Sequence, residues 1–207
     1  LSFRTTTTFN LDEYYGLDPA HEQSYRQFMN ANLFNHIDID LAKTHVPDGK
    51  AADVEAFCEG YEAAIRAAGG IDLQVLGIGS DGHIGFNEPG SSLGSRTRLV
   101  ALDEMTIRDN ARFFSSEADV PRFAVTMGVG TVLDAREVLL VANGKKKAPV
   151  VAAAIEGPIT ALISASALQL HPRVTFFLDE EAASNLKRTA YYRFAEQAEK
   201  QLGRTIF

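Results

Sequence analysis

Three side chains that can transfer protons lie close together in the segment GIGSDGHIGFNE, residues 77–88. Asp81, His83 and Glu88 stand on a backbone whose glycines allow all three side chains to turn inward. An imidazole between two carboxylates can have its tautomer fixed and its pKa raised toward neutrality, where it serves as a general acid or base. The segment therefore predicts a proton-transfer site.

Other interpretations of this segment stay open on spacing alone. The interpretation of His83 as an exposed loop histidine between two solvated acids explains the spacing as well as a catalytic role does. The same three residue types also bind metals, but no second histidine lies at ligand spacing, which disfavours a metal site. The GxGxxG match to dinucleotide-binding loops is disfavoured too, because two glycines and Pro89 in residues 84–92 predict a loop where a cofactor-binding helix must begin.

Alternating strands and helices must position these side chains. Apolar periodicity, cap residues and β-branched runs predict strands at 5–11, 73–78, 122–126, 138–142 and 174–178, and helices at 24–34, 51–68, 145–156 and 181–202. This order predicts an α/β fold, a three-layer αβα, Rossmann-like arrangement in which a mainly parallel sheet carries helices on both faces. Residues 77–88 then follow the carboxyl end of a strand, where sites of open α/β sheets form. No linker or repeat interrupts the pattern, which predicts one domain.

Composition narrows the class of partner. The chain has 207 residues and a formal net charge of −7, which disfavours nucleic acid or an acidic membrane surface and favours a small-molecule substrate. Its single cysteine, Cys58, lies in an apolar helical stripe and is expected to be buried. With no internal disulfide and no apolar run long enough to span a membrane, the sequence predicts a cytoplasmic protein.

Several motifs together resemble the glucosamine-6-phosphate deaminase family, of the sugar-phosphate isomerase/deaminase type. The matching segments cover almost the whole chain: residues 10–14 (NLDEY), 77–89 (GIGSDGHIGFNEP), 95–98 (SRTR), 110–114 (NARFF), 126–131 (TMGVGT), 144–148 (GKKKA) and 168–172 (LQLHP). The shorter GxGxDGH core is also similar to 6-phosphogluconolactonase. A lactone hydrolase and a non-catalytic sugar-phosphate binding module are therefore the alternatives, although the continuation FNEP favours the deaminase.

The resemblance implies a reaction and the residues for it. That family converts glucosamine 6-phosphate and water to fructose 6-phosphate and ammonium, with no metal and no organic cofactor. Asp12 matches the enolisation base, which moves a proton between C2 and C1 of the opened sugar, and Glu13 beside it is expected to be structural. His83 matches the group that opens the pyranose ring, while Asp81 and Glu88 match the carboxylates that orient and tune it.

The resemblance also implies where the substrate binds. Arg112 and Lys147 fall at the family's phosphate-binding positions. From the sequence pattern alone, Lys147 would be interpreted as a solvated lysine at the start of a helix. The backbone at Gly77 and Gly85 is expected to approach the sugar, because the absence of a Cβ permits close contact. A homo-oligomer is a further expectation.

Two departures from the family pattern lead to further expectations. The family has another strand, a phosphate loop and a helix before the position of Leu1. We therefore expect residues 1–207 to form one domain without its first strand–loop–helix unit, and to have low activity alone. Arg98 matches an allosteric position, but Val100 stands where regulated members carry lysine, which disfavours activation by N-acetylglucosamine 6-phosphate.

Overall fold

The computed structural model describes residues 1–203 of the chain. In chain order the strands are β1 (Thr8–Phe9), β2 (Asp12–Tyr14), β3 (Thr44–His45), β4 (Leu73–Leu76), β5 (Arg98–Ala101), β6 (Phe123–Thr126), β7 (Glu137–Ala142) and β8 (Val174–Leu178). The α-helices are α1 (Tyr25–Asn32), α2 (Val54–Ala67), α3 (Glu104–Asn110), α4 (Val129–Leu133), α5 (Ala148–Glu156) and α6 (Thr189–Gln201). Short 3₁₀ turns include η3 (Ala111–Phe113), η5 (Lys145–Lys147) and η6 (Ser164–Leu170).

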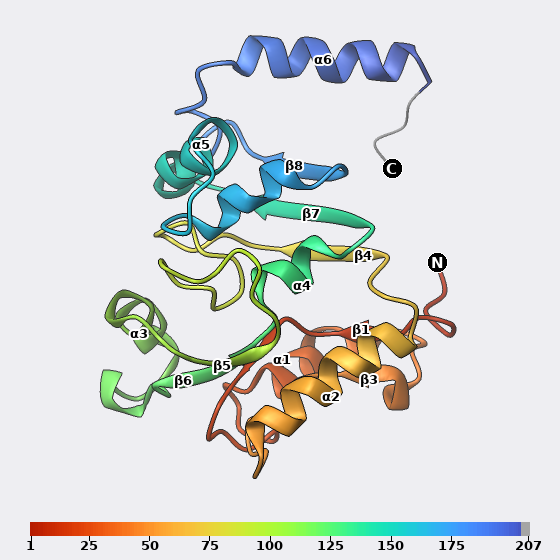
Figure 1. The fold of residues 1–207 in the computed structure, drawn as a ribbon, viewed down its shortest axis with the longest axis vertical. Helices are drawn as coiled ribbons and strands as arrows, with labels where there is room; N and C mark the ends of the chain where they lie inside the picture. The colour runs from red at the N-terminus through yellow and green to blue at the C-terminus, as the bar shows by residue number, and fades with distance from the viewer. Residues whose placement is uncertain (204–207) are drawn as a thin grey trace.

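A parallel sheet of order β4-β7-β8 forms one half of the protein (Figure 1). Leu76 pairs with Leu140 across β4 and β7, and both side chains are buried. They pack with Val151 of α5 and Leu168 of η6 in the largest hydrophobic core. Each strand alternates its side chains between two faces, and this core lies on one of them. The parallel strands place the loops that follow β4 and β7 at the same edge of the sheet.

An antiparallel sheet of order β2-β6-β5 forms the other half. Asp12 of β2 is the register partner of Thr126 of β6, which in turn pairs with Arg98 of β5. An aromatic core that includes Tyr14 and Phe86 supports this sheet. Sequence patterns predicted only its strand β6, at residues 122–126, because β2 and β5 are three and four residues long and too short for a clear alternation.

The predicted elements are largely confirmed. Helix α2 begins where Asp53 accepts a hydrogen bond from the backbone N–H of Ala56, at 3.0 Å. It ends before Gly69 and Gly70, which both adopt the left-handed conformation. The fold class is confirmed, β8 has the predicted bounds, and residues 77–97 form a loop. Cys58 is buried in α2, as expected.

The largest differences from the predicted bounds lie at the first strand and the last helix. The first predicted strand, residues 5–11, shrinks to Thr8–Phe9 before β2 begins. The last predicted helix starts at Thr189, not at 181. Carboxylates hold the intervening residues in turns: Asp179 accepts from the backbone N–H of Ala182, and Glu156 accepts from those of Lys187 and Arg188. These side-chain bonds, local from Asp179 and long-range from Glu156, compete with the helical ladder for the backbone N–H groups.

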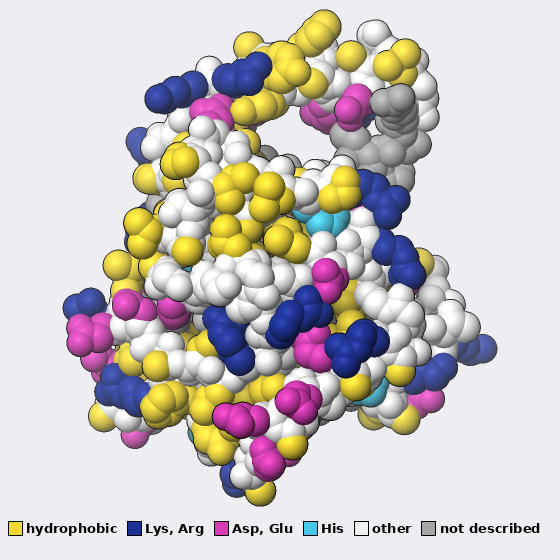
Figure 2. Space-filling model, in the orientation of Figure 1, with side chains coloured by type: hydrophobic (Ala, Val, Ile, Leu, Met, Phe, Trp, Pro, Cys, Tyr) yellow, Lys and Arg dark blue, Asp and Glu magenta, His cyan; other side chains and the backbone are white. Residues whose placement is uncertain are grey.

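The surface carries two further features. A groove of about 850 Å³ runs along residues 5–12 and 70–75 and reaches Asp12. Within residues 1–203, β4 pairs with β7 alone, so its other edge borders this groove. Figure 2 shows Lys and Arg side chains interleaved with Asp and Glu on the face in view.

No helix within residues 1–203 is long and apolar enough to cross a membrane. The expected additional strand–loop–helix unit stays a prediction.

Candidate active site

The antiparallel sheet places Asp12 in the wall of a cavity of about 210 Å³. His83, Gly85, Arg112 and Lys147 line the same cavity. Burial raises the pKa of Asp12 to about 7, and the charge of Glu13 adds to this effect while that of His83 opposes it. A carboxylate with this pKa is a competent base near neutral pH.

A tight turn in the loop after β4 presents His83. The backbone N–H of Gly79 donates to the carbonyl of His83 at 2.8 Å, and Gly82 adopts a φ of +90°. A Cβ at Gly79 would lie 2.5 Å from the imidazole ring, so only glycine lets the ring lie over the backbone here. Ile84 anchors the turn, because its side chain is fully buried and its N–H donates to Ser164 Oγ at 3.2 Å.

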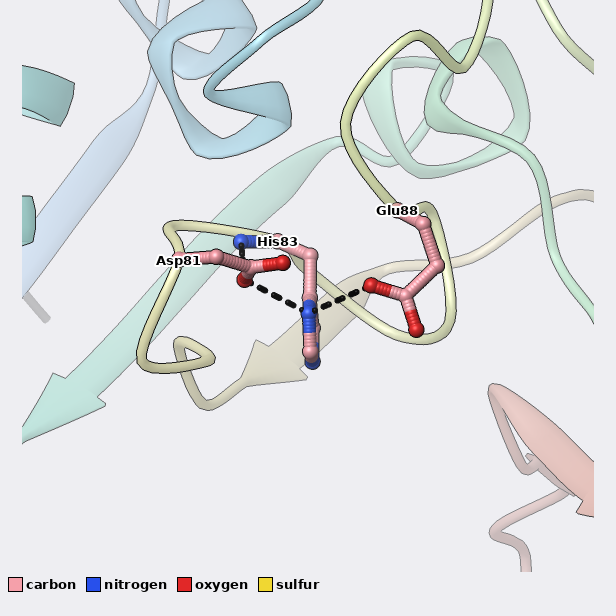
Figure 3. A group of neighbouring side chains, drawn as sticks. All are labelled: Asp81, His83 and Glu88. Atoms are coloured by element: carbon pink, nitrogen blue, oxygen red, sulfur yellow. Dashed lines mark hydrogen bonds and ion pairs between the residues drawn. The ribbon is translucent and has the colours of Figure 1, made fainter. Parts of the chain in front are cut away.

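Asp81 and Glu88 both contact the same nitrogen of His83 (Figure 3). His83 Nδ1 lies 2.7 Å from Asp81 Oδ1 and 3.1 Å from Glu88 Oε2. Burial lowers the pKa of His83, but the contacts and charges of the two carboxylates outweigh burial and raise it to about 9. The imidazole is therefore protonated at neutral pH, and its other nitrogen, Nε2, is left to meet a substrate. A protonated imidazole with a free nitrogen can act as a general acid.

The middle of the loop is held by Asn87, which is fully buried. Its Nδ2 donates to the carbonyl oxygens of Ile84 and Met127, at 2.9 and 2.8 Å. Arg98 donates to Asn87 Oδ1 at 2.9 Å and to Ser91 Oγ at 3.1 Å. Arg98 does not line the cavity and instead braces the loop. Its expected allosteric role stays a prediction.

Two cations, Arg112 and Lys147, line the cavity together with Asp12 and His83. Lys147 follows β7, and its Nζ donates to the carbonyl of Ile78 at 2.7 Å. The guanidinium of Arg112, in η3, lies 4.6 Å from the centroid of the Phe113 ring. Burial lowers the pKa of Lys147, so an anion that approaches it meets a partly desolvated charge. A bidentate guanidinium and a point charge together suit a phosphate group.

The structure places most of the predicted site residues together. Asp12, His83, Gly85, Arg112 and Lys147 line the cavity, and Asp81 and Glu88 contact His83 behind it. Gly77 is not among the lining residues, and a Cβ there would meet nothing within 4 Å, so the close contact expected at Gly77 has no support.

Sequence reasoning missed several lining residues, namely Tyr25, Gly79, Ser80, Phe86, Thr106, Asp109 and Asn110. In the sequence, Tyr25 stands out only as one of the apolar positions of a predicted helix, and such positions usually belong to the core. Ser80 lies inside the predicted motif, and its Oγ donates to Asp109 Oδ2 at 2.7 Å. That bond joins the loop to α3, a contact that no local pattern predicts.

Asp81, His83 and Glu88 could also surround a cation, because one ligand atom from each lies within 4.8 Å of the others. The contacts of His83 Nδ1 explain their spacing without one, since the positive charge of the imidazolium attracts both carboxylates. We assign no metal here, and the expected absence of metal and organic cofactor stays a prediction.

Comparison with known proteins shows which protein family has this fold and site. The chain belongs to the family described as glucosamine-6-phosphate isomerases/6-phosphogluconolactonase, whose model matches residues 1–175. It is 54% identical over 193 residues to the glucosamine-6-phosphate deaminase of Arthrobacter sp. (strain FB24), which covers 93% of this chain and 74% of that one. It is 56% identical over 202 residues to the glucosamine-6-phosphate deaminase of Shewanella loihica, with 98% of this chain and 75% of that one covered.

Solved structures agree with this assignment. A monomeric glucosamine-6-phosphate deaminase matches with a TM-score of 0.87 and 48% identity, over 89% of this chain and 77% of that one. The 6-phosphogluconolactonase from Trypanosoma cruzi matches with a TM-score of 0.66 and 25% identity, over 85% and 70% of the two chains. The resemblance drawn from the motifs is thus confirmed, and the deaminase is favoured over the lactonase. A homo-oligomer stays a prediction.

Proposed function

We propose that this protein deaminates glucosamine 6-phosphate and isomerises it, releasing fructose 6-phosphate and ammonium. The observation that carries the proposal is the shared cavity of Asp12 and His83, which offers a base and an acid to one small substrate. Relatives named for this activity, at 54–56% identity over nearly the whole chain, support it.

His83 opens the sugar ring in this proposal. Its protonated Nε2 gives a proton to the ring oxygen as the bond from C1 to that oxygen breaks. The proton of the C1 hydroxyl leaves to water, so an open-chain aldehyde forms. The contacts of Asp81 and Glu88 with Nδ1 keep the ring charged and oriented for this step.

Asp12 then moves a proton along the carbon chain. Its carboxylate takes the proton from C2 while the protonated amino group gives one of its protons to the carbonyl oxygen at C1, which forms an enolamine. Asp12 then returns its proton to C1, and the product is an iminium ion at C2 with a hydroxyl at C1. Water adds to C2 and the amino group leaves as ammonia, which is protonated to ammonium and leaves a ketone. Because the net reaction consumes one water, we describe it as a hydrolytic deamination coupled to isomerisation.

Arg112 and Lys147 bind the phosphate in this proposal. Both line the cavity that contains the base and the acid, which supports the assignment. Gly85 lets the backbone approach the sugar beside Asp12, since a Cβ there would lie 3.4 Å from Asp12 Oδ2. We also propose a cytoplasmic location, which the single, buried cysteine supports.

Replacing Asp12 with asparagine tests the proposal. Asp12→Asn keeps the size of the side chain but removes the base, so kcat for ammonia release should fall by about a hundredfold or more. Binding of the sugar phosphate, measured by calorimetry, should persist, because the lost group acts in the transition state. Asp48→Asn, at an exposed position, is the matched control.

Undiminished ammonia release by Asp12→Asn would overturn the proposal. Hydrolysis of 6-phosphogluconolactone by both proteins, without ammonia release from the amino sugar, would favour the lactonase. Binding of the sugar phosphate without any turnover would favour a binding module.

The pH profile gives a second test of these roles. Asp12 must be ionised to act as a base, so kcat/KM should fall as the pH drops through about 7. His83 must be protonated to act as an acid, so kcat/KM should fall again as the pH rises through about 9. In Asp12→Asn the acidic limb should disappear from the residual activity.

A further inference from the structure

Glu13 is a buried carboxylate beside the base, and the proposed reaction does not use it. It follows Asp12 in β2, and only 3% of its surface is exposed. Neighbouring side chains of a strand point to opposite faces, so Glu13 points away from the face that Asp12 occupies. A buried charge is costly unless several donors compensate it, so its contacts indicate its role.

The carboxylate of Glu13 caps the first turn of α1. Its Oε1 accepts from the backbone N–H of Tyr14 at 2.9 Å and from that of Tyr25 at 3.0 Å. Its Oε2 accepts from the N–H of Arg26 at 3.0 Å. Tyr25 and Arg26 begin α1, where N–H groups lack helical partners and an anion is favoured. Burial raises the pKa of Glu13, whereas these three donors oppose the rise and favour the charged form.

This cap determines where Tyr25 lies. The Tyr25 ring lines the cavity and stacks on Tyr14 with ring centroids 5.5 Å apart. Its centroid lies 6.3 Å from that of Phe86, which also lines the cavity. Because Glu13 bonds the N–H of Tyr25 itself, it joins the start of α1 directly to the strand that carries Asp12. Loss of the cap would release the aromatic wall next to the base.

The charge of Glu13 also acts on Asp12. Electrostatic interactions couple Asp12 to Glu13 and Tyr14 of β2, His83 of the loop, Tyr25 of α1 and Tyr61 of α2. Asp109, Arg112 and Lys147 line the same cavity. Burial raises the pKa of all three tyrosines, so they are neutral at the working pH. Among the groups coupled to Asp12, Glu13 therefore carries the negative charge that raises its pKa and the imidazolium of His83 the positive charge that lowers it.

We propose that Glu13 is a positioning residue for the reaction: its buried carboxylate fixes Tyr25 and the first turn of α1 against the cavity, and its charge acts on the neighbouring Asp12. The inference rests on the proposed function of Asp12 as the base. It assigns to Glu13 a role in turnover, beyond the structural role that the sequence suggested.

The variant Glu13→Gln separates charge from shape. Glutamine keeps the shape and one acceptor oxygen, which serves the N–H groups of Tyr14 and Tyr25 but not that of Arg26. It carries no charge, so Asp12 should become easier to ionise. The acidic limb of kcat/KM for ammonia release should move to lower pH by roughly 0.5–1 pH unit. The alkaline limb, which reports His83, should move much less. Glu22→Gln, at an exposed position just before α1, should leave both limbs in place.

Two variants of Tyr25 test the wall alone. Tyr25→Phe keeps the ring and should leave KM near the wild-type value. Tyr25→Ala removes the ring and should raise KM about tenfold, because the substrate loses one side of its pocket. If Glu13→Gln does not fold, as judged by circular dichroism, Tyr25→Ala still decides the positioning claim.

A carbon NMR titration of the Asp12 carboxyl group, without substrate, separates this inference from the proposed function. A lower Asp12 pKa in Glu13→Gln supports the inference even if the wild type releases no ammonia. A folded Glu13→Gln with an unchanged Asp12 titration and unchanged acidic limb would overturn it. With Glu13→Gln unfolded, an unchanged KM in Tyr25→Ala would overturn it as well.

Discussion

Replacing Glu88 with glutamine removes one of the two carboxylates at His83 Nδ1 and keeps the shape of the side chain. Burial lowers the pKa of His83, yet Asp81 and Glu88 raise it from 6.5 to about 9. This difference corresponds to about 3 kcal/mol in favour of the imidazolium. Asp81 Oδ1 lies closer to Nδ1 than Glu88 Oε2 does, 2.7 Å against 3.1 Å. Glu88 therefore supplies the smaller share, and its removal should lower the pKa by about one pH unit, or ~1.4 kcal/mol.

The expected result is specific to alkaline pH. At pH 9 the charged fraction of His83 should fall from about one half to about one tenth, so kcat/KM should fall about fivefold. At pH 7 the imidazole stays almost fully charged in both proteins, and kcat/KM should change little. Ammonia release measured from about pH 6 to about pH 10 gives the two limbs of the profile. Proton NMR of the imidazole gives the His83 titration without substrate.

The controls make the result decisive. Glu117→Gln removes a carboxylate at an exposed position and should leave the alkaline limb in place. Asp81→Asn should move that limb further than Glu88→Gln, because it removes the closer contact. A folded Glu88→Gln protein with an unchanged alkaline limb and an unchanged His83 titration would refute the reasoning. The charge of Glu88 would then have no influence on the acid.

Two further predictions concern the frame of the site. Gly85→Ala should lower kcat/KM at least about tenfold, because Gly85 has a φ of +57° and a Cβ would lie 3.0 Å from Thr126 Oγ1. Gly90→Ala, with a φ of +95° but open space around it, should cost stability without that loss of activity. Burial raises the pKa of Glu62, but bonds from Thr131, Thr97 and Arg96 outweigh it and lower the pKa to about 2. Since this folded-state pKa is below the unfolded value, Glu62 should contribute about 3 kcal/mol above pH ~4.5, lost as the pH falls toward ~2. Urea unfolding should show this pH dependence in the wild type and not in Glu62→Gln.

Local chemistry was predictable wherever the signal lay within a few residues. Asp53 at the start of α2 and the glycine pair at its end are cap signals that act on adjacent backbone. The contacts among Asp81, His83 and Glu88 follow from a short loop that glycines allow to turn sharply. Membership of the family then led to Asp12, Arg112 and Lys147, which spacing alone does not connect to the loop.

Features that depend on distant parts of the chain were not predictable. The register of Asp12 with Thr126 is set by the pairing of two short strands, and the sequence of neither strand indicates which strand it pairs with. Tyr25 lines the cavity, and its N–H donates to Glu13 of a distant strand, a contact that no local pattern predicts. The turns before α6 form because Glu156, on another helix, accepts their N–H groups. In each case a tertiary contact outweighs the local propensity.

The row Asp12, Thr126 and Arg98 across the antiparallel sheet has a mechanical consequence. Arg98 also holds Asn87 in the loop that carries His83, which ties this part of the loop to the sheet of Asp12. The start of the same loop is tied to the parallel-sheet half, because Lys147 Nζ donates to the carbonyl of Ile78 and the N–H of Ile84 donates to Ser164 Oγ. The loop therefore bridges the two halves. A shift of one sheet relative to the other would be taken up between Ile78 and Asn87, where His83 lies.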